Sequence, residues 1–308
     1  MQMSWRGVMP ATTTAFDENL NIDHAFVAKH ARWLIDNGCT AIIAPGSLGE
    51  SATLSFDEKI ALWFTLVDAV GERVPVVAAI AALSTAEAIA LAKRAAEVGC
   101  KGLMVLPPYV YKSDWREMKA HVQAVFRATS LSCMLYNNPV AYGTDFLPEQ
   151  IRELAAEHEN FAAVKESSTD VRRVTWIRAL VGDRLDISVG VDDAIVEGIA
   201  AGAVGWVAGL VNALPRESVV LFDYAMKGEH EKARELYEWF LPLLRLDTVP
   251  KFVQLIKLVQ AEVGMGSTRV RPPRLELIGA ELEDAQRVIR HALDTRIELS
   301  TSSAARNP

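Results

Sequence analysis

The stretch that decides the fold of this chain reads Phe161-Ala162-Ala163-Val164-Lys165-Glu166-Ser167-Ser168. Four apolar residues lead directly into a lysine, and charged and hydroxylic residues follow it. A short apolar run that ends in polar residues is typical of a strand buried on both faces of a sheet. We therefore predict a strand over residues 162–165 with the lysine at its carboxyl end. A lysine that turns outward into solvent is the simpler alternative from these residues alone.

A lysine that instead faces the dry interior has a particular chemistry. Burial disfavours the ammonium form, so it lowers the pKa of the side chain and favours a neutral amine that can attack a carbonyl carbon. Schiff-base formation requires such an amine. Lys165 is thus a candidate covalent nucleophile, and the rest of the sequence must decide between the two positions.

Comparable apolar runs alternate with helical patterns over residues 1–226. The predicted strands cover residues 7–13, 40–44, 74–79, 102–106, 132–136, 162–165, 186–189 and 205–208. Helix starts are predicted at Ser55 and Ser84, each followed three residues later by glutamate, and at Asp23 and Asp114. Glycines follow the helical stretches as stop signals: Gly38, Gly71, Gly99, Gly182 and Gly202.

Eight strands that alternate with helices predict a closed (β/α)8 TIM barrel. The competing architecture is a doubly wound open sheet, which usually has a phosphate-binding fingerprint after its first strand. Pro10-Ala11-Thr12-Thr13-Thr14 is not such a fingerprint. We predict that residues 1–226 form the barrel and that 227–299 add a three-helix appendage. Residues 300–308 are expected to form a disordered tail.

The composition excludes several classes of protein. Half of the 308 residues are hydrophobic, and a net charge of −7 is spread along the chain, so no surface for nucleic acid or an anionic membrane is expected. The first residues run directly into a strand, and no run of eighteen apolar residues occurs, which predicts a cytoplasmic protein. Cys39, Cys100 and Cys133 are expected to be buried, reduced thiols. No His or Cys pair has metal-ligand spacing and no nucleotide-binding loop occurs, so we expect neither a metal nor an organic cofactor.

The carboxyl ends of the strands are where a barrel of this kind has its active site. Tyr136 and Lys165 are 29 residues apart, the length of one strand–helix unit, so they are expected to end adjacent strands. A phenol can supply and recover the protons that Schiff-base chemistry moves. The loop Gly46-Ser47-Leu48-Gly49 offers backbone N–H groups at a helix start, which can hold a carboxylate. A rim tyrosine packed on Pro139 and an ordinary tight turn are the respective alternatives.

Other polar residues near the strand ends are given structural roles. Asp192-Asp193 is predicted to cap the helix after the seventh strand, although Asp192 is also a candidate substrate contact. Glu50 and Glu166 are predicted to form structural hydrogen bonds rather than to transfer protons. The six histidines are expected at the surface. Three arginines are expected to contact the barrel or a neighbouring subunit: Arg269, Arg271 and Arg274.

These motifs together resemble the dihydrodipicolinate synthase / N-acetylneuraminate lyase family of class I Schiff-base enzymes, over nearly the whole chain. The resemblance is based on Gly46-Ser47-Leu48-Gly49-Glu50, Tyr136-Asn137-Asn138-Pro139, Val164-Lys165-Glu166, Gly190-Val191-Asp192-Asp193 and residues 202–212. It implies that Lys165 forms the Schiff base, that Tyr136 transfers protons and that Ser47 holds the carboxylate of a 2-oxo acid. The expected substrate-binding residues are Gly46, Leu48, Tyr109, Tyr142, Ser167, Asp192 and Val207. The resemblance also implies a homotetramer built as a dimer of dimers.

The sequence departs from the synthases at three places. Their loop has two adjacent threonines where this chain has Ser47-Leu48. Ala141 stands where they place an arginine that grips the carboxylate of a second substrate. The aromatic residue that they contribute across a subunit interface falls near Val110, and either Tyr109 or Tyr111 is a candidate to replace it. A condensation that builds a dicarboxylate is therefore poorly served.

The same motifs look like a branch among hydroxyproline-catabolic enzymes. That branch contains Δ1-pyrroline-4-hydroxy-2-carboxylate deaminases, which implies release of ammonia and 2-oxoglutarate semialdehyde from a cyclic imino acid. Dehydration of a 2-keto-3-deoxy sugar acid is the closest alternative, followed by pyruvate-dependent aldol chemistry. A non-catalytic barrel that binds a metabolite is the distant alternative, and the presence of both Lys165 and Tyr136 argues against it.

Overall fold

Eight short strands form the centre of the protein. The computed structural model describes residues 3–109 and 111–299. The strands are β1 (Gly7–Pro10), β2 (Ile42–Ala44), β3 (Val76–Ile80), β4 (Gly102–Val105), β5 (Ser132–Asn137), β6 (Phe161–Glu166), β7 (Asp186–Val189) and β8 (Gly205–Ala208). Each predicted strand is present, with ends that differ from the prediction by no more than three residues.

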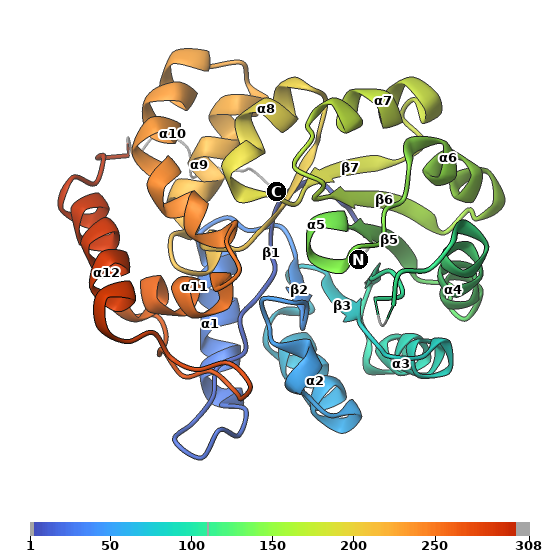
Figure 1. Cartoon of the computed structure of the whole chain (residues 1–308), viewed down its shortest axis with the longest axis horizontal. Coiled ribbons are helices and arrows are strands. Elements are labelled where there is room, and N and C mark those ends of the chain that lie inside the picture. Colours follow the sequence, from blue (N-terminus) through green and yellow to red (C-terminus); the bar gives the residue numbers. More distant parts are fainter. Residues whose placement is uncertain (1–2, 110, 300–308) are drawn as a thin grey trace.

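The sheet closes on itself. Its strands are parallel and run in the order β1-β8-β7-β6-β5-β4-β3-β2. Ala11 then bridges Ile43, and the Thr12 N–H donates to the Ile43 carbonyl at 2.9 Å, which joins the segment after β1 to β2. Figure 1 shows the strands at the centre with helices around them. The predicted (β/α)8 barrel is confirmed, and the open sheet is excluded.

In the described part of the chain, nine helices surround the strands, and the first four begin at the residues that the sequence predicts. They are α1 (His24–Asp36), α2 (Phe56–Val70), α3 (Thr85–Val98), α4 (Trp115–Arg127), α5 (Pro139–Tyr142), α6 (Pro148–Glu157), α7 (Arg172–Val181), α8 (Ile195–Ala200) and α9 (Pro215–Met226). Ser55 and Asp114 cap α2 and α4 in full capping boxes, and Asp23 and Ser84 cap α1 and α3. These caps fix where each helix leaves its strand.

Side chains along each strand alternate between two buried layers. On β3, Val77 and Ala79 point into the barrel, whereas the intervening residues pack against the surrounding helices. The same period of two puts Ala163 inside, Val164 outside and Lys165 inside. Lys165 is only 6% exposed, so the alternative of a solvent-facing lysine is excluded.

Three further helices follow the barrel: α10 (His230–Leu244), α11 (Phe252–Glu262) and α12 (Gly279–Asp294), with the short 3-10 helix η4 (Arg245–Asp247) after α10. They pack against one another and against the end of the barrel, where α11 contacts η3 (Leu210–Asn212). The three predicted appendage helices are therefore present, while a division at residue 226 stays a prediction. The predicted tail 300–308 lies outside the described residues. No helix in 3–109 or 111–299 is long and apolar enough to cross a membrane.

Buried side chains agree with the prediction for cysteine but not for histidine. All three cysteines are buried free thiols. The expectation of surface histidines is wrong for three of the six, because His30, His121 and His158 are buried. Each lies on or at the end of a helix face that packs inward. His30 and His121 form hydrogen bonds through a ring nitrogen, and the ring of His158 packs on an aromatic ring. Position on an amphipathic helix alone does not separate such a histidine from an exposed one.

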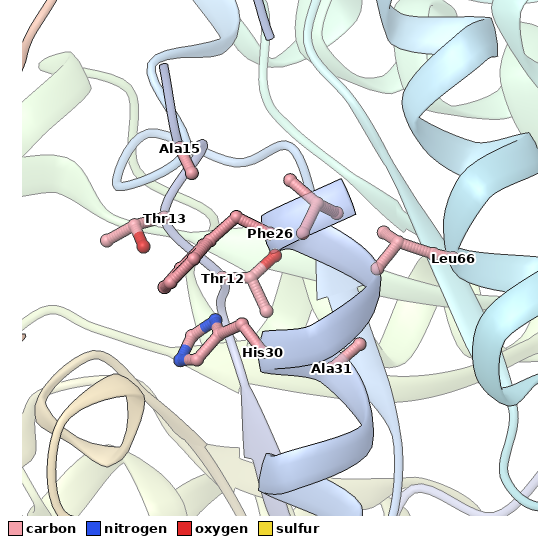
Figure 2. A pocket seen from close by; sticks show the side chains of 8 residues that line it. Thr12, Thr13, Ala15, Phe26, His30, Ala31 and Leu66 are labelled. Carbon is pink, nitrogen blue, oxygen red and sulfur yellow. The ribbon is translucent and has the colours of Figure 1, made fainter. Parts of the chain in front are cut away.

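His30 is the most enclosed of them. Figure 2 shows it on α1, beside Phe26 and facing Thr12 and Thr13 of the segment after β1. Its Nε2 lies 2.8 Å from the carbonyl oxygen of Asn212, so the neutral ring donates to the loop after β8. Burial lowers the pKa of His30 to about 4. The unfolded chain therefore binds a proton here between about pH 6.5 and 4 that the folded chain does not.

This difference predicts an acid-sensitive contribution to stability. The free energy of unfolding should fall by roughly 2 kcal/mol at this site between pH 8 and pH 5, because only the unfolded state gains the proton. His30→Gln should remove that part of the pH dependence, measured by urea unfolding across this range. His291→Gln, on the exposed face of α12, is the matched control and should keep it. Equal pH dependence in the parent and in His30→Gln would contradict the assignment.

Candidate active site

A cavity of about 490 Å³ opens at the carboxyl ends of the strands, a size suited to a small metabolite. Most of the expected site residues line it: Gly46, Ser47, Leu48, Tyr136, Tyr142, Lys165, Ser167 and Val207. Tyr109 and Asp192 are not among its lining residues. Most of the residues expected at the site therefore meet at one cavity at this end of the barrel, and their roles stay predictions.

Lys165 and Tyr136 lie side by side in this cavity. They are direct partners in the register of β5 and β6, and the Nζ atom of Lys165 lies 4.0 Å from the centre of the Tyr136 ring. Within 3–109 and 111–299, Lys165 forms no ion pair. Its amine is therefore close to the phenol and is not held by a carboxylate, as a nucleophile with a neighbouring acid/base group requires.

Gly190 makes room for this lysine. A β-carbon at position 190 would collide with Oγ of Ser167 and lie 2.6 Å from Cε of Lys165. The hydroxyl of Ser167 is buried and has no hydrogen-bond partner in the described part of the chain. The glycine thus allows the loop after β7 to close over Lys165 while a polar group next to it stays available for a ligand.

Three hydroxyl groups, those of Ser47, Tyr142 and Tyr136, belong to residues that form one wall of the cavity. Ser47 Oγ hydrogen-bonds to the hydroxyl of Tyr142, and the rings of Tyr142 and Tyr136 meet edge-on with centroids 5.9 Å apart. The Tyr136 hydroxyl accepts from Asn138 Nδ2 at 3.0 Å. Burial is the main cause that raises the pKa of Tyr142, so this phenol stays protonated. The wall can therefore donate hydrogen bonds to an anionic ligand.

The loop that contains Ser47 differs from the prediction. It does not open directly into a helix but forms turns, in which the N–H groups of Glu50 and Ser51 donate to the carbonyls of Ser47 and Gly46. A single 3-10 turn, η1 (Ser51–Thr53), precedes α2. Glu50 adopts a left-handed conformation with φ of +57°, which turns its side chain inward.

Glu50 holds this loop against the C-terminal helices. Its Oε1 atom accepts from Lys257 Nζ of α11 at 2.6 Å, and its Oε2 atom accepts from the Arg271 N–H at 3.0 Å. Both members of the ion pair are almost fully buried. The structural role predicted for Glu50 agrees with these contacts. Arg271 contacts the barrel, as expected, through a bidentate pair with Glu58.

The candidate substrate contact at Asp192 does not fit its position. Asp192 is fully buried in η2 (Asp192–Ala194), and its carboxylate accepts from Trp206 Nε1 and from the N–H groups of Gly209 and Leu210. It therefore orders the loop after β8 instead of capping a helix or reaching the cavity. Glu166 has a similar structural role, since it accepts from Asn137 Nδ2 and the Ser168 N–H.

The two tyrosines after β4 differ in their positions. Tyr109 packs on Tyr142 with ring centroids 5.6 Å apart, outside the cavity lining, and Tyr111 is exposed. Val110 lies outside the described residues. Which of the two tyrosines completes a site is therefore still a prediction.

The C-terminal segment adds cavity residues that the sequence did not reveal. Asp247, the segment 248–250, Phe252 and Arg274 all line the cavity. A search confined to the ends of predicted strands misses them, because they come from η4, α11 and the loop before α12. The sequence contains one signal for this part of the cavity, because Arg274 directly follows two prolines in an otherwise helical segment.

Known proteins are similar to this chain in sequence and in fold. The model of the dihydrodipicolinate synthetase family matches residues 4–292. The chain belongs to this family. Enzymes of the family are class I Schiff-base lyases, in keeping with a lysine at the carboxyl end of β6.

Individual relatives span nearly the same length. The chain is 35% identical over 233 residues to a 4-hydroxy-tetrahydrodipicolinate synthase of Geobacter metallireducens. The matched region is 76% of this chain and 80% of the relative. Dihydrodipicolinate synthase DapA-2 of Bacillus anthracis superposes with a TM-score of 0.90 at 32% identity, covering 94% of this chain and 99% of the other. The prophage protein YagE of E. coli K12, solved in complex with pyruvate, gives 0.88 at 25% identity, with coverage of 94% and 99%.

The buried ion pair under the Ser47 loop gives a prediction. Lys257→Met should destabilise the protein by roughly 3–5 kcal/mol, because it leaves the Glu50 carboxylate buried without its cation. Lys251→Met, which breaks the exposed pair between Lys251 and Glu281, is the matched control and should cost less than about 1 kcal/mol. Urea unfolding measures both. Similar losses in the two variants would show that Glu50 does not depend on Lys257.

Proposed function

We propose that the protein is a lysine Schiff-base lyase that acts on a small 2-oxo or cyclic imino acid. The observation that carries the proposal is the pair of Lys165 and Tyr136, with Nζ 4.0 Å from the ring centre, in the cavity at the carboxyl ends of the strands. Membership of a family of Schiff-base lyases supports the same chemistry. Lys165 is the nucleophile, and Tyr136 transfers protons to and from the carbinolamine.

The carboxylate of the substrate binds at the loop after β2 in this proposal. Gly46, Ser47 and Leu48 line that side of the cavity. The Ser47 hydroxyl and the Leu48 N–H are the donors, and the hydroxyls of Tyr142 and Ser167 are close enough to the cavity to add hydrogen bonds. Val207, at the base of the cavity on β8, contacts the carbon chain of the substrate.

We further propose Δ1-pyrroline-4-hydroxy-2-carboxylate as the substrate. Two features of the cavity lining favour a substrate with a single carboxylate. Ala141 lines the cavity where an arginine would be needed to hold a second one, and Leu48 presents an apolar side chain in place of a hydroxyl. Apart from Lys165, Arg274 is the basic side chain that lines this cavity. A second carboxylate would therefore have to reach Arg274 for a cationic partner, because position 141 offers none.

The reaction begins with attack of the Lys165 amine on C2 of the ring. The C2–N bond breaks, and the ring nitrogen leaves as the primary amine on C5. A proton is lost from C3, and the resulting enamine expels the hydroxyl of C4 as water, with the Lys165 iminium as electron sink. One proton then moves from C5 to C3 and another moves from the amine nitrogen to C4, which gives an imine at C5. Two hydrolyses release ammonia and 2-oxoglutarate semialdehyde and free Lys165, for a net uptake of one water.

Pyruvate-dependent aldol chemistry is the second candidate. The curated relatives are named 4-hydroxy-tetrahydrodipicolinate synthase, and YagE was solved with pyruvate bound. Both facts favour a 2-oxo acid that forms an iminium at the same lysine. Ala141 argues against a condensation partner with its own carboxylate, so we place this reaction second. A cytoplasmic location and a homotetramer remain predictions.

Schiff-base formation predicts a covalent adduct. Borohydride reduction in the presence of pyruvate should attach one pyruvyl unit to Lys165, detected by peptide mass spectrometry. Lys165→Ala should abolish the adduct, whereas Lys59→Met, a change at another buried lysine that lies outside the cavity, should keep it. An adduct that survives Lys165→Ala would sink the proposed mechanism.

The substrate is tested by assaying ammonia release from Δ1-pyrroline-4-hydroxy-2-carboxylate. Tyr136→Phe should reduce kcat by about 10²- to 10⁴-fold, the usual size of a proton-transfer contribution. Parallel assays follow dehydration of 2-keto-3-deoxy sugar acids and consumption of pyruvate with a carboxylate-bearing aldehyde. Turnover of one of these, but not of the imino acid, would reject the deaminase assignment and retain the Schiff base.

A further inference from the structure

The 3-10 helix η4 brings a carboxyl group into the cavity from outside the barrel. Asp247 is its last residue and lines the cavity together with Lys165. Its Oδ1 atom is shielded from solvent and has no hydrogen-bond partner in residues 3–109 and 111–299. A shielded polar atom without a partner is rare in a folded protein and calls for an explanation. A substrate group that binds there supplies one.

The surroundings of Asp247 favour the neutral acid. Burial is the largest cause that holds its pKa well above the ordinary range, and the carboxylates of Asp192 and Asp193 in η2 act in the same direction. The positive charge of Lys165 opposes them. Once Lys165 is converted to an iminium, its charge stays in the cavity, so the balance of these groups is retained during the reaction.

The backbone around Asp247 is shaped to admit its side chain. A β-carbon at position 209 would collide with Oδ1 of Asp247. Gly209 is itself fixed by Asp192, which accepts its N–H. The loop after β8 thus leaves room for this carboxyl group and holds that room open, although it donates no hydrogen bond to Oδ1.

We propose that Asp247 is the catalytic acid that protonates the hydroxyl leaving group on C4 of the substrate. The inference rests on the proposed function, because it assumes an iminium at Lys165 and a hydroxyl two carbons away from it. In that step the C3 enamine pushes electrons toward C4, and the C4–O bond breaks. The proton of Asp247 moves to the departing oxygen, so that water leaves. The Asp247 carboxylate then takes a proton from a water molecule that enters from solvent, which returns it to the acid form.

Other acids near the cavity are less suited to this step. The carboxylate of Asp192 is already bonded to three donors, and Glu166 lies outside the cavity lining and is bonded to Asn137 and Ser168. Tyr136 lies against Lys165. In the proposed reaction it transfers protons at C2 and C3, the carbons nearest to the lysine. Asp247 enters the cavity from η4, outside the barrel strands that carry Lys165 and Tyr136. It can therefore act on a carbon farther along the chain of the substrate.

The test compares Asp247→Asn with the parent on two substrates. The asparagine has the same size but carries no acidic proton. On Δ1-pyrroline-4-hydroxy-2-carboxylate, kcat for ammonia release should fall at least about 100-fold with KM changed by less than about threefold, as expected for a lost general acid. On the 4-chloro analogue, whose chloride leaves without a proton, the variant should act within about threefold of the parent.

Three controls separate chemistry from folding. Asp247→Asn should still form the borohydride adduct at Lys165 and should still exchange the methyl protons of pyruvate in D2O, because both steps precede departure of the hydroxyl. Its Tm should be unchanged or higher, since a shielded carboxyl without a partner is removed. Asp170→Asn, at the same end of the barrel but paired with the exposed Arg172, should behave as the parent on both substrates.

The outcomes distinguish this inference from the proposed function. An unchanged kcat, or an equal loss on the hydroxyl and chloro substrates, overturns the role of Asp247 and leaves the deaminase assignment intact. Failure of the parent to release ammonia rejects that assignment instead. The same pair is then assayed on a 2-keto-3-deoxy sugar acid, whose hydroxyl leaves from the same carbon, and a selective loss there supports Asp247. Turnover of neither compound by the parent overturns both.

Discussion

The period of two along a barrel strand is the constraint on which the site depends. Because Ala163 packs inside the barrel and Val164 packs against the helices, Lys165 has to face the interior. The parallel register of β5 and β6 places Tyr136 directly beside it. Burial on both faces of the sheet fixes this register, since a shift by one residue would exchange the two buried layers. Lys165 and Tyr136 are therefore positioned by the same packing that closes the barrel.

The C-terminal helices complete the site from outside the barrel. Lys257 on α11 holds the loop that carries Ser47 through its buried pair with Glu50. The segment before α11 contributes Asp247, and the loop before α12 contributes Arg274. A barrel mouth alone supplies the lysine, the tyrosine and the carboxylate loop. We propose that the groups that select among 2-oxo and imino acids come from this added layer, so that one framework can serve reactions that begin alike and end differently.

The sequence predicts the barrel and its reactive end well, because apolar runs, capping residues and glycines are local signals. It also pairs Lys165 with Tyr136, since their spacing is one strand–helix unit. It does not predict Asp247, whose approach to the cavity depends on how η4 packs against the loop after β8. Asp192 shows the converse: its place at a strand end makes it a candidate substrate contact in the sequence, but its bonds to Trp206 and Gly209 form only in the folded chain. His30 is a third example, because its burial is decided by the loop after β8 and by the segment after β1.

The chemistry that follows from this arrangement separates two tasks. In the proposed reaction, Lys165 and Tyr136 make and use an iminium, and the surrounding residues determine what leaves from the carbons beyond it. The central claim is the covalent bond to Lys165. A crystal structure of the protein soaked with pyruvate tests it most directly. If Lys165 is the nucleophile, continuous density will run from its Nζ atom to C2 of pyruvate, and the carboxylate will lie against Ser47 and the Leu48 N–H. Pyruvate bound without a covalent link, or linked to another lysine, would contradict it.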